Sequence, residues 1–170
     1  MKNHSGLRPQ DIPILLKIAT KKSKPWLMKD LANELVISPS EISESLNRSM
    51  LAGLLSADKQ KLMTASLLEF LQFGLKYVYP QKPGSIVRGM PTSHSAPPLN
   101  KLIKSKENYV WPYAQGQVSG QSIEPLYKTV PKACEKDPIL YELLALTDAL
   151  RIGKNREKNL AIIELKKRLS

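Results

Sequence analysis

Residue types that carry covalent or metal chemistry are scarce in this chain, which has two histidines and one cysteine among 170 residues. Three such groups cannot complete a four-ligand zinc site without carboxylates, and their spacing does not suggest one. His94 falls in a proline-rich stretch and is expected to be a surface histidine. Cys134 has no base near it in the sequence to activate it as a nucleophile. Neither GxxxxGK[ST] nor GxGxxG occurs, so we expect no catalysis, no metal and no cofactor.

A second set of polar residues has a spacing suited to recognition. Hydroxyl, amide and carboxylate side chains recur every three or four residues between positions 38 and 48, so a helix would present most of them on one face. Such groups exchange hydrogen bonds with base edges in the major groove of DNA, and an arginine near the far end is placed for a phosphate. The predicted contact residues of this helix are Ser38, Ser40, Ser43, Glu44, Asn47 and Arg48.

The element that would position this face is well marked at both ends. Ser38 is a candidate N-cap, Pro39 fits the first helical position, and Glu41 completes a Ser-x-x-Glu capping box. Gly53 suits the position after the last turn, where a left-handed backbone favours a residue without Cβ. A shorter helix is expected just before it, at residues 28–35.

Apolar periodicity predicts further elements around this helix pair. A first helix should run from Pro9 to about Lys21. Two short strands are expected at 54–56 and 61–63, joined by a turn. A fourth helix should begin at a second capping box that starts with Ser66.

The composition changes at residue 80. Five prolines and two glycines between residues 80 and 99 predict a long loop. Residues 109–111 and 117–123 are expected to pair as a β-hairpin. A helix should run from an Asp137 cap to a Gly153 stop, and a last helix from 156 to 169. The aromatic residues 109, 111 and 113 follow three lysines and would suit stacking on bases, but their alternation favours one face of a half-buried strand.

These elements together predict a mainly α fold with small β content (α+β). A winged helix-turn-helix domain would occupy residues 1–79. A C-terminal extension at 80–170 would comprise the loop-rich segment, the hairpin and a helical pair.

The segment LMKDLANELVISPSEISESLNRSMLAGLLS resembles the centre of winged-helix regulators of the multiple-antibiotic-resistance-regulator type and related families. Their pattern is LA-x-x-L-x-h-S-x-S-x-h-S, where h is apolar, followed by a helix that ends in Ala-Gly-Leu. The resemblance covers residues 9–63. It implies a recognition helix at 39–52 and a wing at 54–63, with Lys59 and Lys61 presented to phosphate or to the minor groove.

The bulk charge agrees with a polyanion as partner. The chain has 26 basic and 15 acidic residues and a formal net charge of +11, and basic side chains displace the counterions condensed on phosphates. The excess is spread along the whole chain, so a DNA footprint would extend beyond residues 1–79. A single cysteine and the lack of a long apolar run predict a cytoplasmic protein without a membrane segment.

The function that these patterns favour is sequence-specific binding of double-stranded DNA by a transcriptional regulator, with a homodimer or a protein partner contacted through the C-terminal helices. Two alternatives remain open. One is a DNA-binding antitoxin or accessory protein of a two-protein system, which stable co-purification with a second protein would favour. The other is a protein–protein interaction module, because Glu41 and Glu44 place carboxylates on the predicted reading helix.

Overall fold

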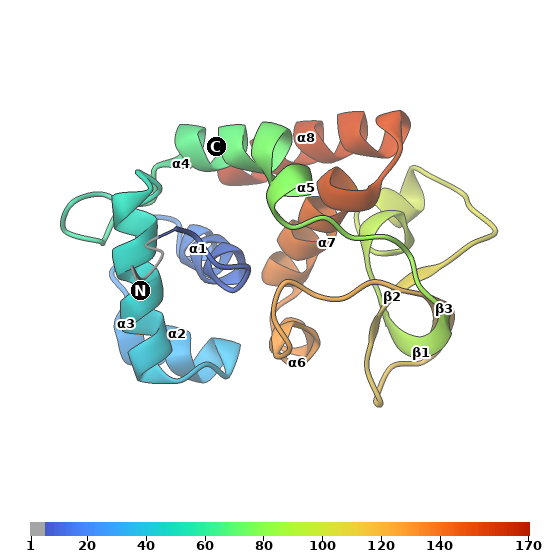
Figure 1. Ribbon diagram of the computed structural model, residues 1–170, viewed down its shortest axis with the longest axis horizontal. Coiled ribbons are helices and arrows are strands. Elements are labelled where there is room, and N and C mark those ends of the chain that lie inside the picture. Colours follow the sequence, from blue (N-terminus) through green and yellow to red (C-terminus); the bar gives the residue numbers. More distant parts are fainter. Residues whose placement is uncertain (1–5) are drawn as a thin grey trace, which may run out of the picture.

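The structure is a computed structural model that describes residues 6–170. Helices α1 (Asp11–Thr20), α2 (Met28–Leu35) and α3 (Pro39–Leu51) form one end of the molecule. A small sheet of three strands lies at the opposite end, and helix α7 (Pro138–Ile152) lies between the two (Figure 1). The prediction of a mainly α fold with small β content is therefore confirmed.

Helix α3 begins and ends where its sequence predicts. Pro39 is its first residue, and Ser38 Oγ accepts a hydrogen bond from the backbone N–H of Glu41 at 3.3 Å. Gly53, just after the helix, has a φ of +78°, a conformation that costs glycine little. The reciprocal half of the capping box is absent, because the Glu41 carboxylate binds Arg48 and Gln10.

Residues 54–63, here called the wing segment, form less regular structure than predicted. The two expected strands are reduced to a single antiparallel bridge between Leu55 and Leu62. Backbone hydrogen bonds from Ser56 N to Lys61 O (2.8 Å) and from Met63 N to Leu54 O (2.9 Å) close the loop. The wing segment is thus a tight loop on a short stem.

A helix with an irregular middle follows the wing segment. It comprises α4 (Thr64–Glu69), a π-helical turn (Phe70–Gly74) and α5 (Leu75–Val78). The predicted start at Ser66 is wrong, since the helix begins two residues earlier and Met63 at its N-cap offers no side-chain cap. The buried face consists of Leu67, Leu71 and Leu75, spaced four residues apart.

The sheet corrects two predictions about the second half. Strand β1 (Ile86–Pro91) lies inside the stretch predicted to be a long loop. Strands β2 (Tyr109–Pro112) and β3 (Val118–Ser122) do not form the predicted antiparallel hairpin, because they pair in parallel and each is antiparallel to β1. Gly89 is the partner of both Pro112 and Val118, so β2 and β3 follow one another along β1.

Close approach of backbones explains this arrangement. A Cβ on Gly89 would collide with the carbonyl oxygen of Trp111, and a Cβ on Gly116 would collide with the backbone of Gly89. The connection between β2 and β3 therefore passes directly over β1 at a point where only glycines fit. Two 3₁₀ turns, Ser93–Ser95 and Leu99–Lys101, occupy the connection between β1 and β2.

The C-terminal helices are α6 (Val130–Glu135), α7 and α8 (Asn155–Leu169). The predicted cap of α7 is confirmed, with Asp137 accepting a hydrogen bond from Leu140 N at 3.0 Å, and Gly153 follows its last residue. Ten of its residues are buried, because α7 contacts α1, α5, α6 and α8. One hydrophobic cluster consequently crosses the predicted boundary at residue 79.

A buried lysine also joins the two halves of the chain. Lys17 Nζ of α1 lies 2.8 Å from Glu34 of α2 and 2.5 Å from Asp137 at the start of α7. Burial acts to lower the pKa of Lys17, but its two carboxylate partners outweigh that effect and raise it. None of the helices in residues 6–170 combines the length and apolar character that crossing a membrane requires.

Candidate nucleic-acid interface

The outer face of α3 carries most of the predicted recognition residues. Ser38, Ser40, Glu44 and Asn47 are exposed and Ser43 is half-buried. The opposite face is buried against α1 and α2, and contains Ile42, Ser45, Leu46 and Ser49. Five of the six residues expected on this helix therefore share an accessible surface of hydroxyl, amide and carboxylate groups.

Arg48 is the exception, and its predicted role as a phosphate contact needs correction. Its side chain is 9% exposed and forms a bidentate ion pair with the fully buried Asp11 of α1, with Nε–Oδ2 and Nη2–Oδ1 distances of 2.9 and 2.7 Å. The hydrogen bonds to Asp11 raise the pKa of Arg48. Position 48 lies on the same side of α3 as the buried Ser45 and Ser49, so its guanidinium points inward.

The carboxylates on α3 are explained by the same ion pair. Glu41 Oε1 accepts from Arg48 Nη2 at 2.5 Å and from Gln10 Nε2 at 3.1 Å. Partial burial acts to raise the pKa of Glu41, but these hydrogen bonds outweigh it and lower the pKa. Glu44 is exposed, with its carboxylate 3.8 Å from Arg48 Nη1. Arg48 thus faces three carboxylates with a single positive charge from behind the exposed face, which is left without an accessible cation.

The wing segment lies beside α3 and carries two of the predicted contact residues. Lys59 is half-buried in the loop with a φ of +60°, and its backbone N–H donates to Ser56 O at 2.8 Å. Lys61 is exposed. Asp58 precedes both lysines in the chain and accepts hydrogen bonds from Ser56 Oγ and Gln60 N, which lower its pKa. The loop therefore presents two lysines just after one ordered carboxylate.

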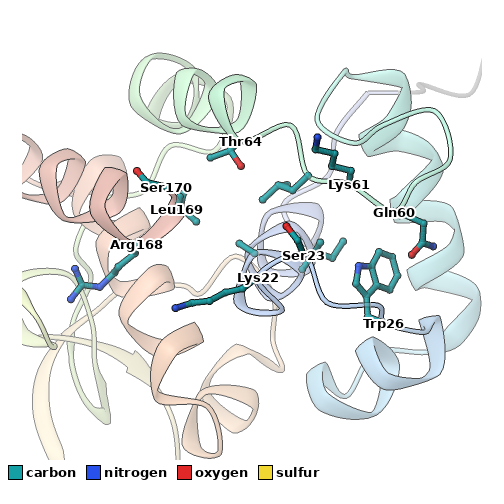
Figure 2. A pocket seen from close by; sticks show the side chains of 12 residues that line it. Lys22, Ser23, Trp26, Gln60, Lys61, Thr64, Arg168, Leu169 and Ser170 are labelled. Atoms are coloured by element: carbon teal, nitrogen blue, oxygen red, sulfur yellow. The ribbon is translucent and has the colours of Figure 1, made fainter.

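A cleft of about 710 Å³ separates the wing segment from the end of α8. Figure 2 shows Lys61 on one side of it and Lys22 on another, with Trp26 below. Lys22 and Ser23, which line the cleft, have φ values of +49° and +63°. Two adjacent residues other than glycine thus adopt a left-handed backbone, which is uncommon for residues with a Cβ. Lys61 therefore belongs to the wing segment and also lines the cleft.

Further lysines surround the start of α2. Lys22, Lys24 and Lys29 are exposed, and within residues 6–170 no carboxylate lies within 4.0 Å of their ammonium groups. Lys21 differs, because its Nζ lies 2.7 Å from Glu34. The cations accessible near α3 thus belong to neighbouring segments, and sequence patterns assigned only those of the wing segment to the interface.

The residues considered for catalysis occupy structural positions. His94 is 7% exposed, its Nε2 lies 2.9 Å from Glu107 O, and its ring packs edge-on against Tyr109. The prediction of a surface histidine is therefore wrong. Cys134 is buried, which raises the pKa of its thiol, and a thiol held protonated is a poor nucleophile. In the described part of the chain, no three histidine, cysteine or carboxylate side chains are grouped to hold a metal ion.

Comparison with family models, with curated proteins and with solved structures finds no match to this chain.

Proposed function

We propose that the protein binds double-stranded DNA sequence-specifically, with the outer face of α3 in the major groove. The observation that carries this proposal is the accessible face of a capped helix, on which Ser40 and Asn47 are exposed and Ser43 is half-buried. Hydroxyl and amide groups at such spacing suit hydrogen bonding to base edges. A transcriptional regulator in the cytoplasm is the role that agrees best with such a face and with a net charge of +11.

Affinity and specificity would come from different elements in this protein. The face of α3 has no accessible cation, so it contributes little to the counterion release that dominates DNA affinity. Lys59 and Lys61 of the wing segment, together with the lysines near the start of α2, would supply phosphate contacts. Substitutions in the two groups are therefore expected to have separable effects.

The first experiment is selection of bound sites from a random duplex pool, followed by salt titration of the affinity for the selected site. Asn47→Ala should change the preferred sequence. Lys59→Ala combined with Lys61→Ala should keep the preference and lower the slope of log K against log salt by about 2. A wild-type protein that binds no duplex with a salt-dependent affinity would overturn the proposal.

A protein partner is the second candidate, favoured by exposed aromatic residues on the helix at 64–78. Phe73 and Tyr77 are 64% and 74% exposed and lie four residues apart. By contrast, most of α7 is buried inside the molecule, so a homodimer or partner contact through the C-terminal helices would rest on α8. Native mass measurement of wild type and of Phe73→Ser with Tyr77→Ser distinguishes these surfaces, since only a contact through this helix would be lost in the variant.

A further inference from the structure

A small groove lies between α2 and α6, next to the turn that leads into α3. Its volume is about 130 Å³. Helices α2 and α6, which contact each other, lie near one another in Figure 1. It brings residues of the second half of the chain against the helix pair at 28–51. Its lining consists of Lys17, Asn33, Glu34, Val36, Lys132, Ala133, Lys136 and Asp137.

The charges in this groove do not cancel. Lys17 is paired with both Glu34 and Asp137, and Lys21 is also paired with Glu34, so two ammonium groups balance the two carboxylates of the groove. Lys132 and Lys136 are exposed, and no carboxylate of residues 6–170 lies within 4.0 Å of either ammonium group. The groove therefore carries an uncompensated positive charge at its α6 side.

The packing of α6 keeps both lysines at the surface. Val130, Ala133 and Cys134 are buried in the hydrophobic cluster. Lys132 lies between these positions in the helix, and Lys136 follows its last residue. Because the inner face of α6 is buried in the core, Lys132 on the helix and Lys136 just after it are held at the surface.

The turn beside the groove leads directly into the predicted reading helix. Val36 has a φ of +56° and is 45% exposed, and the N–H of Ile37 donates to Ala32 O at 3.1 Å. Ser38, the N-cap of α3, follows at once. A recognition helix contacts base edges with its N-terminal residues, so groups next to that end face the phosphates that border the groove of DNA.

We propose that Lys132 of α6 and Lys136, which follows α6, form a phosphate-contact site for DNA beside the start of α3, together with the exposed amide of Asn33. This inference rests on the proposed function and adds a residue set from outside the segment that resembles winged-helix regulators. It supplies cations that the face of α3 lacks. It also gives the second half of the chain a direct part in binding.

The test uses a double variant in which Lys132→Ala is combined with Lys136→Ala. This variant is compared with a matched control. The control is Lys104→Ala with Lys106→Ala, which removes the same charge from two exposed lysines. Their loop, between the 3₁₀ turn at Leu99–Lys101 and β2, lies at the opposite end of the molecule from α2 and α3 (Figure 1). Affinity for the selected duplex is measured by fluorescence anisotropy across a series of salt concentrations.

The α6 variant should bind roughly tenfold more weakly than wild type, with a salt slope smaller by about 2 and an unchanged preferred sequence. The control should match wild type. Lys132→Arg with Lys136→Arg should restore binding, because the charge is kept. If circular dichroism shows that the alanine variant has lost its helical structure, the double variant Lys132→Gln with Lys136→Gln replaces it.

The outcomes separate the two proposals. Wild-type protein that shows no salt-dependent DNA binding overturns the proposed function and this inference with it. Wild-type protein that binds, with the α6 variant and the control equal to one another, overturns this inference and leaves the proposed function standing. A loss confined to the α6 variant and restored by arginine supports the site.

Discussion

Each half of the molecule contains a buried aspartate, and the two are held in opposite ways. Asp11 receives two N–H groups of Arg48 and the backbone N–H of Arg8, at 2.7–2.9 Å. Asp148 receives the hydroxyl of Thr92 and the indole N–H of Trp111, both at 2.7 Å and both on Oδ2. Arg151 Nε stays 3.8 Å from its other oxygen.

The difference separates a charge-dependent contact from one that depends on hydrogen-bond geometry. The ion pair of Asp11 fixes α3 against α1 and removes a cation from the surface of α3. Neutral donors hold Asp148, which joins α7 to β2 and to the residue after β1, and burial raises its pKa. One aspartate therefore positions the predicted reading helix, and the other positions the sheet.

The largest effect is expected from Arg48→Ala, because it leaves a buried carboxylate without a counter-charge. Removing one partner of a buried pair typically costs about 3–5 kcal/mol of unfolding free energy. Asp148→Ala should cost about 2–3 kcal/mol, since it strands a buried hydroxyl and an indole N–H. Urea unfolding measures both values.

Arg48→Lys is the matched control, because lysine keeps the charge but cannot form the bidentate contact. It should recover only part of the lost stability. If Arg48→Ala instead left the urea midpoint unchanged and abolished DNA binding, Arg48 would be a phosphate contact and the comparison between the aspartates would fail.

Two glycines sharpen the same comparison. Gly89→Ala in β1 should cost about 3 kcal/mol, because the new Cβ meets the carbonyl oxygen of Trp111 and the strands must separate. In Gly53→Ala, after α3, the new Cβ meets no atom within 4 Å. This variant should lose about 1–2 kcal/mol of unfolding free energy, because alanine is strained in the left-handed backbone at this position. Thermal unfolding of the two variants gives the order, and equal losses would contradict it.

The sequence predicted the helices well because their ends are marked by local signals. Ser38 starts α3 and Asp137 starts α7, in each case by accepting a hydrogen bond from a backbone N–H three residues away, and a proline follows each cap. Gly53 and Gly153 follow the last turns. Such signals act over one turn of helix, so they are readable without knowing the fold.

The sheet and the ion pair were not predictable in this way. The partners of β1 lie 19 to 35 residues away, and its two pairings meet at Gly89, which no alternation of apolar residues indicates. Arg48 and Asp11 are 37 residues apart. Helical spacing placed Arg48 near the end of α3, but only the position of α1 decides that it points inward.

The smallest effects concern pH, and they should differ in sign between the halves. The pKa of Glu41 is lowered in the folded protein, so its stabilisation is present above the ordinary glutamate pKa of about 4.3 and is lost as the pH falls below it. The pKa of Asp148 is raised by burial, so its contribution is fullest below the ordinary aspartate pKa of about 3.9 and declines as the pH rises.

Glu41→Gln should therefore make the unfolding free energy fall less steeply between pH 5 and pH 3, because a proton-linked contact with Arg48 is removed. Asp148→Asn should make the unfolding free energy fall more steeply on acidification from pH 7, because residue 148 of the folded state no longer takes up a proton. The amide oxygen of the asparagine still accepts hydrogen bonds from Thr92 and Trp111. Urea unfolding at pH 7, 5.5, 4.5 and 3.5 measures both slopes against wild type. Changes of the same sign in the two variants would show that the aspartate of the sheet is held by charge after all, as Asp11 is.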